Sequence, residues 1–579
     1  MIKKLASCIR EYKKPAIITL ILIVLEAVIE TYIPFITARL VNNIKAGAVV
    51  GDIIKTGIFL ILIALLSLFC GGLAGFTCSK SSAGFAKNLR SDVFSKIQTY
   101  SFENIDKFSS SSLVTRLTTD INNVQMSFMM IIRTAIRAPL MLVFSTVMAY
   151  VMGGFLASSF VIVIPVLGFG LFMVAKKAMP AFRSVFKKYD KLNESIEENV
   201  RAMRVVKGFS REEYEKEKFS RSSDDICKDF TKAERIVALN TPLMTLCMYI
   251  NMVFILFIGA KFAISSGGTT IDVGQISAMI TYGMQILMSL MMLSMILVII
   301  TLSAESAKRI CEILDESPTI TNPDNPIYEV KDGSVDFENV SFKYSQRAEK
   351  NALSNINIHI DSGMTVGIIG TTGSSKSSLV QLIARLYDTT EGSVKVGGVD
   401  VKNYDIVSLR NSVAMVLQKN VLFSGTIKEN LRWGNENATD EEIIEACKLS
   451  QSSEFIETFP QKYDTYIEQG GTNVSGGQKQ RLCIARALLK KPKILILDDS
   501  TSAVDTKTDS LIRDGFKKFI PETTKIIIAQ RIASVMESDL IIVMNEGSIN
   551  EIGTHDELMK TCEIYKETYF EQINGGDEE

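Results

Sequence analysis

The sequence predicts a membrane α-helical domain of six transmembrane helices with long cytosolic extensions, fused to an α/β P-loop domain. Hydrophobic residues make up 47% of the 579 residues and mean hydropathy is +0.20. This apolar excess lies before about residue 302, and long apolar stretches of this kind identify transmembrane helices. The remainder has ordinary soluble composition and contains a glycine-bearing loop that ends in Lys376. The length itself predicts several domains.

The composition changes along the chain mark three regions. We expect a transmembrane domain at 1–302, a linker at 303–333 and a nucleotide-binding domain at 334–579. The linker is indicated by Pro318 and by the pairs Asn322-Pro323 and Asn325-Pro326. From Ser334 onward short strands alternate with helices, which is typical of an α/β domain.

Six apolar segments are long enough to cross a bilayer, which takes about 20 helical residues. They are 16–37, 55–78, 134–153, 155–176, 237–263 and 275–301. Gly153-Gly154 separates the third from the fourth, so these two should form a tight hairpin. The first segment is too long for a cleavable signal peptide and has no small-residue cleavage site.

Two long polar stretches, rich in Lys and Arg, follow the second and the fourth apolar segments. By the positive-inside rule, both stretches and both termini are cytoplasmic. Apolar residues at helical spacing continue into these stretches, which indicates that the transmembrane helices extend into the cytosol. Their tips, near Phe102–Ser109 and Phe209–Glu217, are the expected contacts for a cytoplasmic domain.

Charge and cysteine content exclude other classes of function. The chain has 63 Lys and Arg against 64 Asp and Glu, a net charge of −1, so no nucleic-acid partner is expected. Nine cysteines occur without a repeated spacing and with only two histidines in the chain. A disulfide or metal framework is therefore not expected.

Ionisable and methionine side chains inside the apolar segments are candidate substrate contacts. Glu26 and Glu30 share one helix face, and ionisable residues within a membrane segment are functional hypotheses by default. They could face a central cavity and favour a cationic substrate, or act in an extracellular gate. The alternative is that Glu30 lies near the outer interface and Glu26 pairs with a polar group on another helix. A cytosolic-interface position would explain Arg133 and Arg137.

A methionine stripe in the sixth segment is the second candidate, because methionine suits surfaces that bind varied apolar ligands. Lipid-facing or helix-packing roles are the alternative. The stripe comprises Met284, Met288, Met291 and Met295.

The run Val366 to Ile369 predicts a buried strand that leads directly into a phosphate-binding loop. Loop N–H groups and the following helix N-terminus would cradle phosphate oxygens, Lys376 would reach the β and γ phosphates, and Ser377 would bind Mg²⁺. The expected phosphate-contacting residues are Gly370, Thr371, Thr372, Gly373, Ser374, Ser375, Lys376, Ser377 and Ser378. Ser375 stands where the strict motif has its second glycine, and its Cβ would strain the loop.

With these motifs in place, the whole chain resembles a subunit of an ATP-binding cassette (ABC) exporter. The most specific match is 474–481, which contains the signature residues Ser475, Gly476, Gly477 and Gln478. The resemblance implies that Tyr344 stacks on adenine, that Asp498 is the Walker B aspartate and that Gln418 senses magnesium. Ser502-Ala503-Val504-Asp505 is similar to the D-loop.

The resemblance also implies the cofactors and the assembly. ATP and Mg²⁺ are expected, with Ser377, Gln418 and Asp498 as metal contacts. Two nucleotide-binding domains would enclose two ATP molecules head to tail, so that each site combines one chain's phosphate loop with the other chain's signature motif.

Two positions depart from the family pattern at its catalytic residues. Asp499 replaces the glutamate that serves as general base, and its side chain is one methylene shorter. Gln530 replaces the switch histidine and cannot take up positive charge near the γ-phosphate. Together with Ser375, these changes predict that this chain's own site binds ATP but turns it over slowly or not at all.

The intact signature motif then favours a heterodimeric, multidrug-type exporter in which this chain is the half with the degenerate site. The predicted partner is a second, non-identical ABC half-transporter with a competent site, and the substrate is an apolar or amphipathic small molecule. The expected location is a bacterial plasma membrane, with the nucleotide-binding domain in the cytoplasm. The alternatives are a homodimeric exporter with slow hydrolysis and a non-transporting, nucleotide-gated membrane regulator.

Overall fold

A computed structural model describes residues 1–267, 269, 271–345, 348–500 and 504–574. The chain forms two compact units. The membrane unit comprises 1–99 and 109–316, and the α/β unit comprises 100–108 and 317–579. The segment Tyr100–Phe108 lies in the first half of the sequence, but it packs with the second half.

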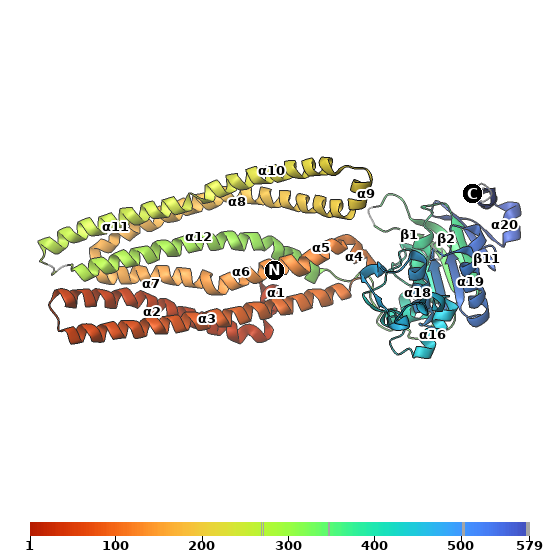
Figure 1. Cartoon of the computed structure of the whole chain (residues 1–579), viewed down its shortest axis with the longest axis horizontal. Coiled ribbons are helices and arrows are strands. Elements are labelled where there is room, and N and C mark those ends of the chain that lie inside the picture. Colours follow the sequence, from red (N-terminus) through yellow and green to blue (C-terminus); the bar gives the residue numbers. More distant parts are fainter. Residues whose placement is uncertain (268, 270, 346–347, 501–503, 575–579) are drawn as a thin grey trace. The chain divides into compact units, whose positions relative to one another are not determined.

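Long helices that lie side by side make up the membrane unit (Figure 1). Its principal helices are α1 (Ile2–Ser7), α2 (Lys13–Lys45), α3 (Val50–Gln98), α5 (Ser110–Thr115), α6 (Ile121–Met130), α7 (Ile136–Gly153), α8 (Ser158–Arg201), α9 (Met203–Gly208), α10 (Glu212–Val237), α11 (Asn240–Ser265) and α12 (Val273–Asp315). Two π-helical turns, η2 (Arg116–Asp120) and η3 (Ile131–Ala135), interrupt the third long helix. Such turns are frequent at functional sites.

Five helical ranges in the described part of the chain are long and apolar enough to cross a membrane. They are Arg10–Lys45, Val50–Gln98, Ser110–Arg201, Glu212–Ser265 and Val273–Asp315. The predicted third and fourth segments both fall within Ser110–Arg201, where α7 and α8 meet at the short turn η4 (Gly154–Ala157). Gly154 has φ of 46°, a conformation that glycine adopts without steric cost. Figure 1 shows the chain reversing between α7 and α8. The count of six crossings stays a prediction.

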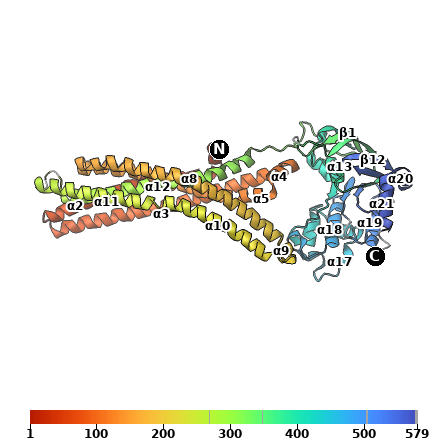
Figure 2. The same ribbon diagram turned by 90° about the horizontal axis from the view of Figure 1, so that it is seen from above.

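The polar extensions of the long helices are helical, as the periodicity predicts. α8 and α10 pack side by side well beyond the apolar segments, as both views show (Figures 1 and 2). α12 continues to Asp315, so 303–315 is helix where the sequence predicted the start of a linker. The helix does not end at 302 because the change from apolar to polar residues there brings no helix-breaking residue before Pro318.

Close backbone approach fixes α12 against α2. Asn42 accepts a hydrogen bond from the Gly274 N–H at 2.9 Å, and a Cβ on Gly274 would overlap the carbonyl oxygen of Ala38. Deeper in the pair, the buried Tyr282 hydroxyl donates to the Thr31 carbonyl at 2.9 Å. Asp272 and Gln275 form a capping box at the start of α12. These contacts set the register of the helix that carries the methionine stripe.

The described residues of the α/β unit form three sheets with helices packed around them. Its strands are β1 (Val335–Phe342), β2 (Leu353–Ile360), β3 (Thr365–Gly370), β4 (Glu391–Val396), β5 (Val399–Asp400), β6 (Val413–Val416), β7 (Gly425–Thr426), β8 (Tyr466–Ile467), β9 (Ile494–Asp498), β10 (Thr524–Ile528), β11 (Leu540–Asn545) and β12 (Ser548–Gly553). Its helices are α4 (Phe102–Phe108), α13 (Lys376–Ile383), α14 (Ile406–Ser412), α15 (Ile427–Arg432), α16 (Asp440–Leu449), α17 (Ser453–Ile456), α18 (Gly476–Leu488), α19 (Thr506–Phe519), α20 (His555–Thr561) and α21 (Glu563–Asn574).

The largest sheet has the strand order β12-β11-β3-β10-β9-β6, with parallel pairing throughout except at the β11–β12 edge. Its central strands are buried on both faces, as parallel sheets covered by helices are. A smaller antiparallel sheet has the order β2-β1-β4-β5. The parallel sheet confirms the predicted α/β architecture.

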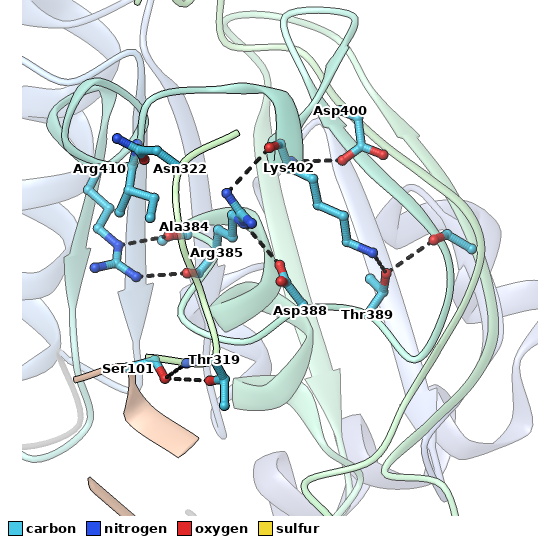
Figure 3. Close-up of polar contacts among 12 residues, drawn as sticks. Ser101, Thr319, Asn322, Ala384, Arg385, Asp388, Thr389, Asp400, Lys402 and Arg410 are labelled. Atoms are coloured by element: carbon cyan, nitrogen blue, oxygen red, sulfur yellow. Dashed lines mark hydrogen bonds and ion pairs between the residues drawn. The ribbon is translucent and has the colours of Figure 1, made fainter. Parts of the chain in front are cut away.

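α4 is held to the rest of its unit by polar contacts. The Asn104 amide donates to the Ser317 carbonyl at 3.1 Å, and the Ser101 and Thr319 hydroxyls lie 2.5 Å apart (Figure 3). In the same region Arg410 donates to the Arg385 carbonyl at 2.8 Å, and Arg385 pairs with Asp388 (Figure 3). The first predicted loop tip therefore contacts the α/β unit.

Candidate functional site

Three parallel strands bring the motif residues to one edge of the sheet. β3 pairs with β10, with Ile368 opposite Ile528, and β10 pairs with β9, with Ile528 opposite Asp498. The carboxyl ends of all three strands therefore lie together, which is where open α/β sheets bind ligands. The phosphate loop follows β3, Asp499 follows β9 and Gln530 follows β10.

The phosphate loop has the backbone that its glycines predict. Gly370 and Gly373 have φ of 156° and 88°, and a Cβ on Gly370 would overlap the carbonyl oxygen of Met544. α13 begins directly after the loop, and no side chain caps it. The N–H groups of its first turn are thus left for an acceptor such as a phosphate, and the helix dipole favours an anion there. This arrangement fits the nucleotide that the motif implies.

Lys376 folds back onto its own loop. Its Nζ donates to the carbonyl oxygens of Gly370 at 2.9 Å and Thr371 at 3.0 Å. Burial lowers the pKa of Lys376, although the nearby carboxylates of Asp498 and Asp499 oppose this shift. A phosphate would offer this ammonium group a stronger, charge-assisted acceptor than the two carbonyls.

Ser375 adopts the left-handed conformation that the motif's glycine normally supplies, with φ of 67° and ψ of 26°. A Cβ in this region costs about 1–2 kcal/mol. The strain expected from the sequence is therefore present in the backbone of the loop.

Replacing Ser375 by glycine is expected to stabilise the α/β unit by about 0.5–1 kcal/mol, because relief of strain exceeds the entropy that a glycine adds to the unfolded chain. Thermal unfolding and ATP affinity of the variant check this. Thr372→Gly is the matched control, since Thr372 lies in the same loop without a positive φ and should lose stability. Equal losses in both variants would contradict the assignment of strain to Ser375.

Two of the residues expected to bind Mg²⁺, Ser377 and Asp498, lie in contact with each other. Asp498 is buried, with 4% exposure, and shares a hydrogen bond with the Ser377 hydroxyl. Burial raises the pKa of Asp498, with a further contribution from Asp499, while Ser377 and Lys376 oppose it. A hydroxyl and a carboxylate are oxygen ligands of the kind Mg²⁺ prefers, so these residues fit the ion.

Asp499 accepts hydrogen bonds from both neighbouring glutamines. Gln530 Nε2 lies 2.8 Å and Gln418 Nε2 lies 3.4 Å from Asp499 Oδ2. Burial raises the pKa of Asp499, and these two amides and the Lys376 charge lower it. Gln418 therefore contacts the general-base position here, whereas its predicted magnesium contact remains a prediction. The two residues that depart from the family pattern lie against each other.

Tyr344 lies over the start of α13, with its hydroxyl 2.7 Å from the Ser378 hydroxyl. Its ring packs edge-on against Tyr387 at 5.2 Å, and Tyr387 packs against Phe102 of α4 at 6.0 Å. The Tyr387 hydroxyl donates to Asp106 Oδ2 at 2.7 Å. Burial raises the pKa of Tyr387, and Asp106 adds to this shift. One tyrosine thus touches both the predicted adenine-stacking residue and α4.

The signature residues begin a helix of their own. Ser475 caps α18 by accepting from the Gln478 N–H at 3.3 Å, while the Gln478 side chain accepts from the Ser475 N–H at 2.9 Å. Gly476 and Gly477 form the first turn, whose N–H groups point out of the helix end. Asp505 caps α19 by accepting from Thr508 N–H at 2.9 Å. Ser502 and Ala503 of the predicted D-loop lie outside the described residues.

The acidic pair in the membrane unit is engaged by an arginine. Arg137 Nη2 lies 2.7 Å from both carboxylate oxygens of Glu30 and 3.5 Å from Glu26 Oε1. Gln285 of α12 donates to the Glu30 carbonyl and accepts from Ser145. Arg137 therefore lies beside the acidic pair and binds it. The interpretation of Arg137 as a residue of the cytosolic interface did not include this partner. The alternative expected a partner on another helix for Glu26; Arg137 of α7 is that partner at 3.5 Å, but its shorter contacts are with Glu30.

The methionine stripe lies on an exposed face of α12. Met284, Met288 and Met295 are 40%, 57% and 63% exposed, and Met291 is half-buried. The face is thus available to lipid, to a second chain or to an apolar ligand, and the substrate role stays a prediction.

Replacing Arg137 by glutamine is expected to lower the free energy of unfolding by about 3 kcal/mol, because two carboxylates are left without their partner within the helices. Thermal unfolding in detergent micelles measures this. Arg133→Gln is the comparison, since among the described residues Arg133 acts on Glu26 through its charge without a hydrogen bond or ion pair, and its loss should therefore cost less. Combining Arg137→Gln with Glu26→Gln and Glu30→Gln should recover most of the loss, and failure to recover would contradict the ion-pair explanation.

Tyr387 and Arg137 were missed as contacts of the predicted site residues. Tyr387 follows α13 without a motif of its own, and only the fold brings it to Tyr344. For Arg137 a signal did exist, because an arginine inside an apolar segment requires an acidic partner. Glu26 and Glu30 were the acidic residues of the apolar segments that could have been predicted as its partners.

Comparisons with known proteins agree with this geometry. Residues 16–290 match the family described as the ABC transporter transmembrane region, and residues 353–502 match the family described as ABC transporter. The chain is 35% identical to the ABC transporter ATP-binding protein YfiB of Bacillus subtilis (strain 168), over 99% of this chain and 98% of that protein. It is 32% identical to Rv1273c of Mycobacterium tuberculosis (strain H37Rv), an ABC transporter ATP-binding protein, over 96% of both chains.

Among solved structures, a bacterial Atm1-family ABC exporter with ATP bound matches with a TM-score of 0.84. The match covers 96% of this chain and 98% of that chain, at 23% sequence identity. At this identity the likeness establishes the fold.

Proposed function

Because the chain belongs to the ABC transporter family, with a transmembrane region fused ahead of an ATP-binding domain, we propose that it is the half of a heterodimeric exporter that carries the degenerate ATP site. Its own site binds ATP with Mg²⁺ and turns it over slowly. Its signature motif completes the hydrolytic site of a non-identical partner. The six apolar segments cross a bacterial plasma membrane with both termini in the cytoplasm.

The observation that carries the proposal is the contact between Asp499 and Gln530. A general base must accept a proton from the attacking water. The carboxylate of Asp499 instead accepts a hydrogen bond from the Gln530 amide, at 2.8 Å. Its side chain is also one methylene shorter than that of glutamate. Misplacement by about 1 Å costs on the order of 100-fold in rate. Both effects slow hydrolysis while leaving the phosphate loop able to hold ATP.

A second observation supports a partner of some kind. α9 and the turn that follows it carry exposed apolar side chains, with Met203 41%, Val205 58% and Phe209 77% exposed. An apolar tip of this kind on a cytosolic extension is typical of a docking surface. A second chain's ATP-binding domain would cover it in a dimer, whether homodimeric or heterodimeric.

The transported compound is proposed to be an apolar or amphipathic small molecule. Arg137 neutralises much of the acidic pair, so Glu26 and Glu30 offer a weaker attraction for a cation than the sequence alone indicated. The exposed methionine stripe on α12 favours apolar contacts.

The function is tested by comparing the purified chain alone with the assembled complex. We expect the chain alone to hydrolyse ATP at a rate near background and the complex to transport a fluorescent apolar compound at the expense of ATP. Brisk hydrolysis by the chain alone would favour the homodimer. ATP binding by a complex without any solute flux would favour the nucleotide-gated regulator.

A further inference from the structure

The C-terminal helix α21 reaches the loop that follows β10. The carboxamide of Gln572, on the last turn of α21, donates from Nε2 to the Gln530 carbonyl oxygen at 2.8 Å. Its Oε1 accepts from the Ile532 N–H at the same distance. One planar amide thus holds two backbone groups of the loop, one on each side of Arg531.

α21 is itself fixed to the core of the α/β unit. Tyr565 is 1% exposed, and its hydroxyl lies 2.8 Å from Nδ1 of His555 on α20. Tyr569, one turn further along, packs edge-on against the His555 ring at 5.3 Å. Gln572 follows on this anchored helix, so its amide is presented to the loop from a rigid body.

The loop held by Gln572 carries the residue that contacts the general-base position. The backbone of Gln530 is bound to α21, and its side chain donates to Asp499 at 2.8 Å. On the sheet side, the Ala529 N–H donates to the Ile368 carbonyl at 3.2 Å. The orientation of the Gln530 side chain therefore depends on a backbone that is fixed from two directions.

We propose that Gln572 is a positioning residue of this chain's ATP site, which holds the loop at 530–532 so that Gln530 lies between Asp499 and the γ-phosphate of bound ATP. The inference rests on the proposed function, because its test measures the nucleotide that this chain's own site retains. It adds the C-terminal helix, which lies outside the matched ATP-binding region at 353–502, to the parts that control the site.

The test is release of nucleotide from this chain's site in the complex, followed with radiolabelled ATP after rapid dilution. Gln572→Ala is expected to release ATP about tenfold faster than the wild type, since two backbone hydrogen bonds that fix the loop are lost. The control is Glu571→Ala, which alters the neighbouring exposed residue on the same helix and should leave release unchanged. Thermal unfolding of both variants accompanies the measurement.

A double-mutant cycle separates positioning from general loosening of the fold. Gln530→Ala keeps the backbone carbonyl that Gln572 binds but removes the side chain that Gln572 orients. If Gln572 acts through that side chain, Gln572→Ala has no further effect on release in the Gln530→Ala background. Full additivity of the two changes overturns the proposal, as does unchanged release by Gln572→Ala in the wild-type background.

Failure of the proposed function is recognised separately. If the wild-type chain hydrolyses its ATP as fast as the partner does, the degenerate site is refuted, and the same cycle is then read on turnover at this site. Coupled effects of Gln530→Ala and Gln572→Ala on that turnover support the positioning role, and additive effects overturn it.

Discussion

Restoring glutamate at Asp499 and histidine at Gln530 together is expected to raise ATP turnover at this chain's own site by about 100-fold. Glutamate places the carboxylate one methylene further from the backbone, where it can accept a proton from the attacking water. Histidine can hold positive charge near the γ-phosphate, which an amide cannot. The change also removes the hydrogen bond that the Gln530 amide donates to the Asp499 carboxylate. Single-turnover hydrolysis, in a complex whose partner site is inactivated, measures the gain.

The two single variants are the controls for this prediction. Asp499→Glu alone keeps Gln530, whose amide can still engage the longer carboxylate, so most of the gain should require both changes. Because the residues are in contact, their effects should be non-additive. A double variant that remains as slow as the wild type would show that another feature, such as the Ser375 loop, limits hydrolysis.

Replacing Ser475 by alanine is expected to reduce ATP turnover of the complex by about 100-fold or more, which is the usual effect of losing one donor aimed at transition-state charge. The serine belongs to the motif that we propose completes the partner's site, and it also caps α18 through the Gln478 N–H. The loss should appear in the steady-state rate of the complex.

Lys376→Ala in the same chain is the informative contrast. It removes the ammonium group that serves this chain's own site and leaves the signature motif intact, so it should reduce the steady-state rate far less than Ser475→Ala. Ser475→Thr keeps a capping hydroxyl and controls for loss of the helix start. Equal losses from Ser475→Ala and Lys376→Ala would contradict the division of labour between the two sites.

The sequence was sufficient to place the phosphate loop and the Asp498-Asp499 pair in the ATP-binding unit, because each of them follows a predictable strand. β3 leads into the phosphate loop and β9 leads into Asp498 and Asp499, as apolar runs of that length indicate. The contact between Asp499 and Gln530 was not predictable, since it requires that β9 and β10 be neighbours in the sheet. The same holds for Gln572, which is separated from Ile532 by 40 residues.

In the membrane unit, hydropathy located the apolar segments but could not say which helices pack together. The ion pair between Glu30 and Arg137 depends on contact between α2 and α7, and apolar segments carry no pattern that selects this neighbour. The predicted end of the domain at 302 reflected the change from apolar to polar residues, whereas the helix itself continues to Asp315. The register of α12 against α2 depends on the backbone approach at Gly274, which a single glycine in a sequence does not reveal.

The membership of α4 in the ATP-binding unit bears on how the chain is made and how it can be divided. Ser101 and Thr319 are 218 residues apart in the sequence, and Asn104 and Ser317 are 213 apart. During synthesis from the N-terminus, α4 emerges long before its partners, so this unit completes its folding only after the apolar helices between them have been made. A protease that cuts between 317 and 333 would leave the C-terminal fragment noncovalently bound to the helical part through α4. A fragment that starts at 334 would lack α4 as well as Ser317 and Thr319, two of the residues that α4 contacts, and should be less stable than the same domain within the whole chain.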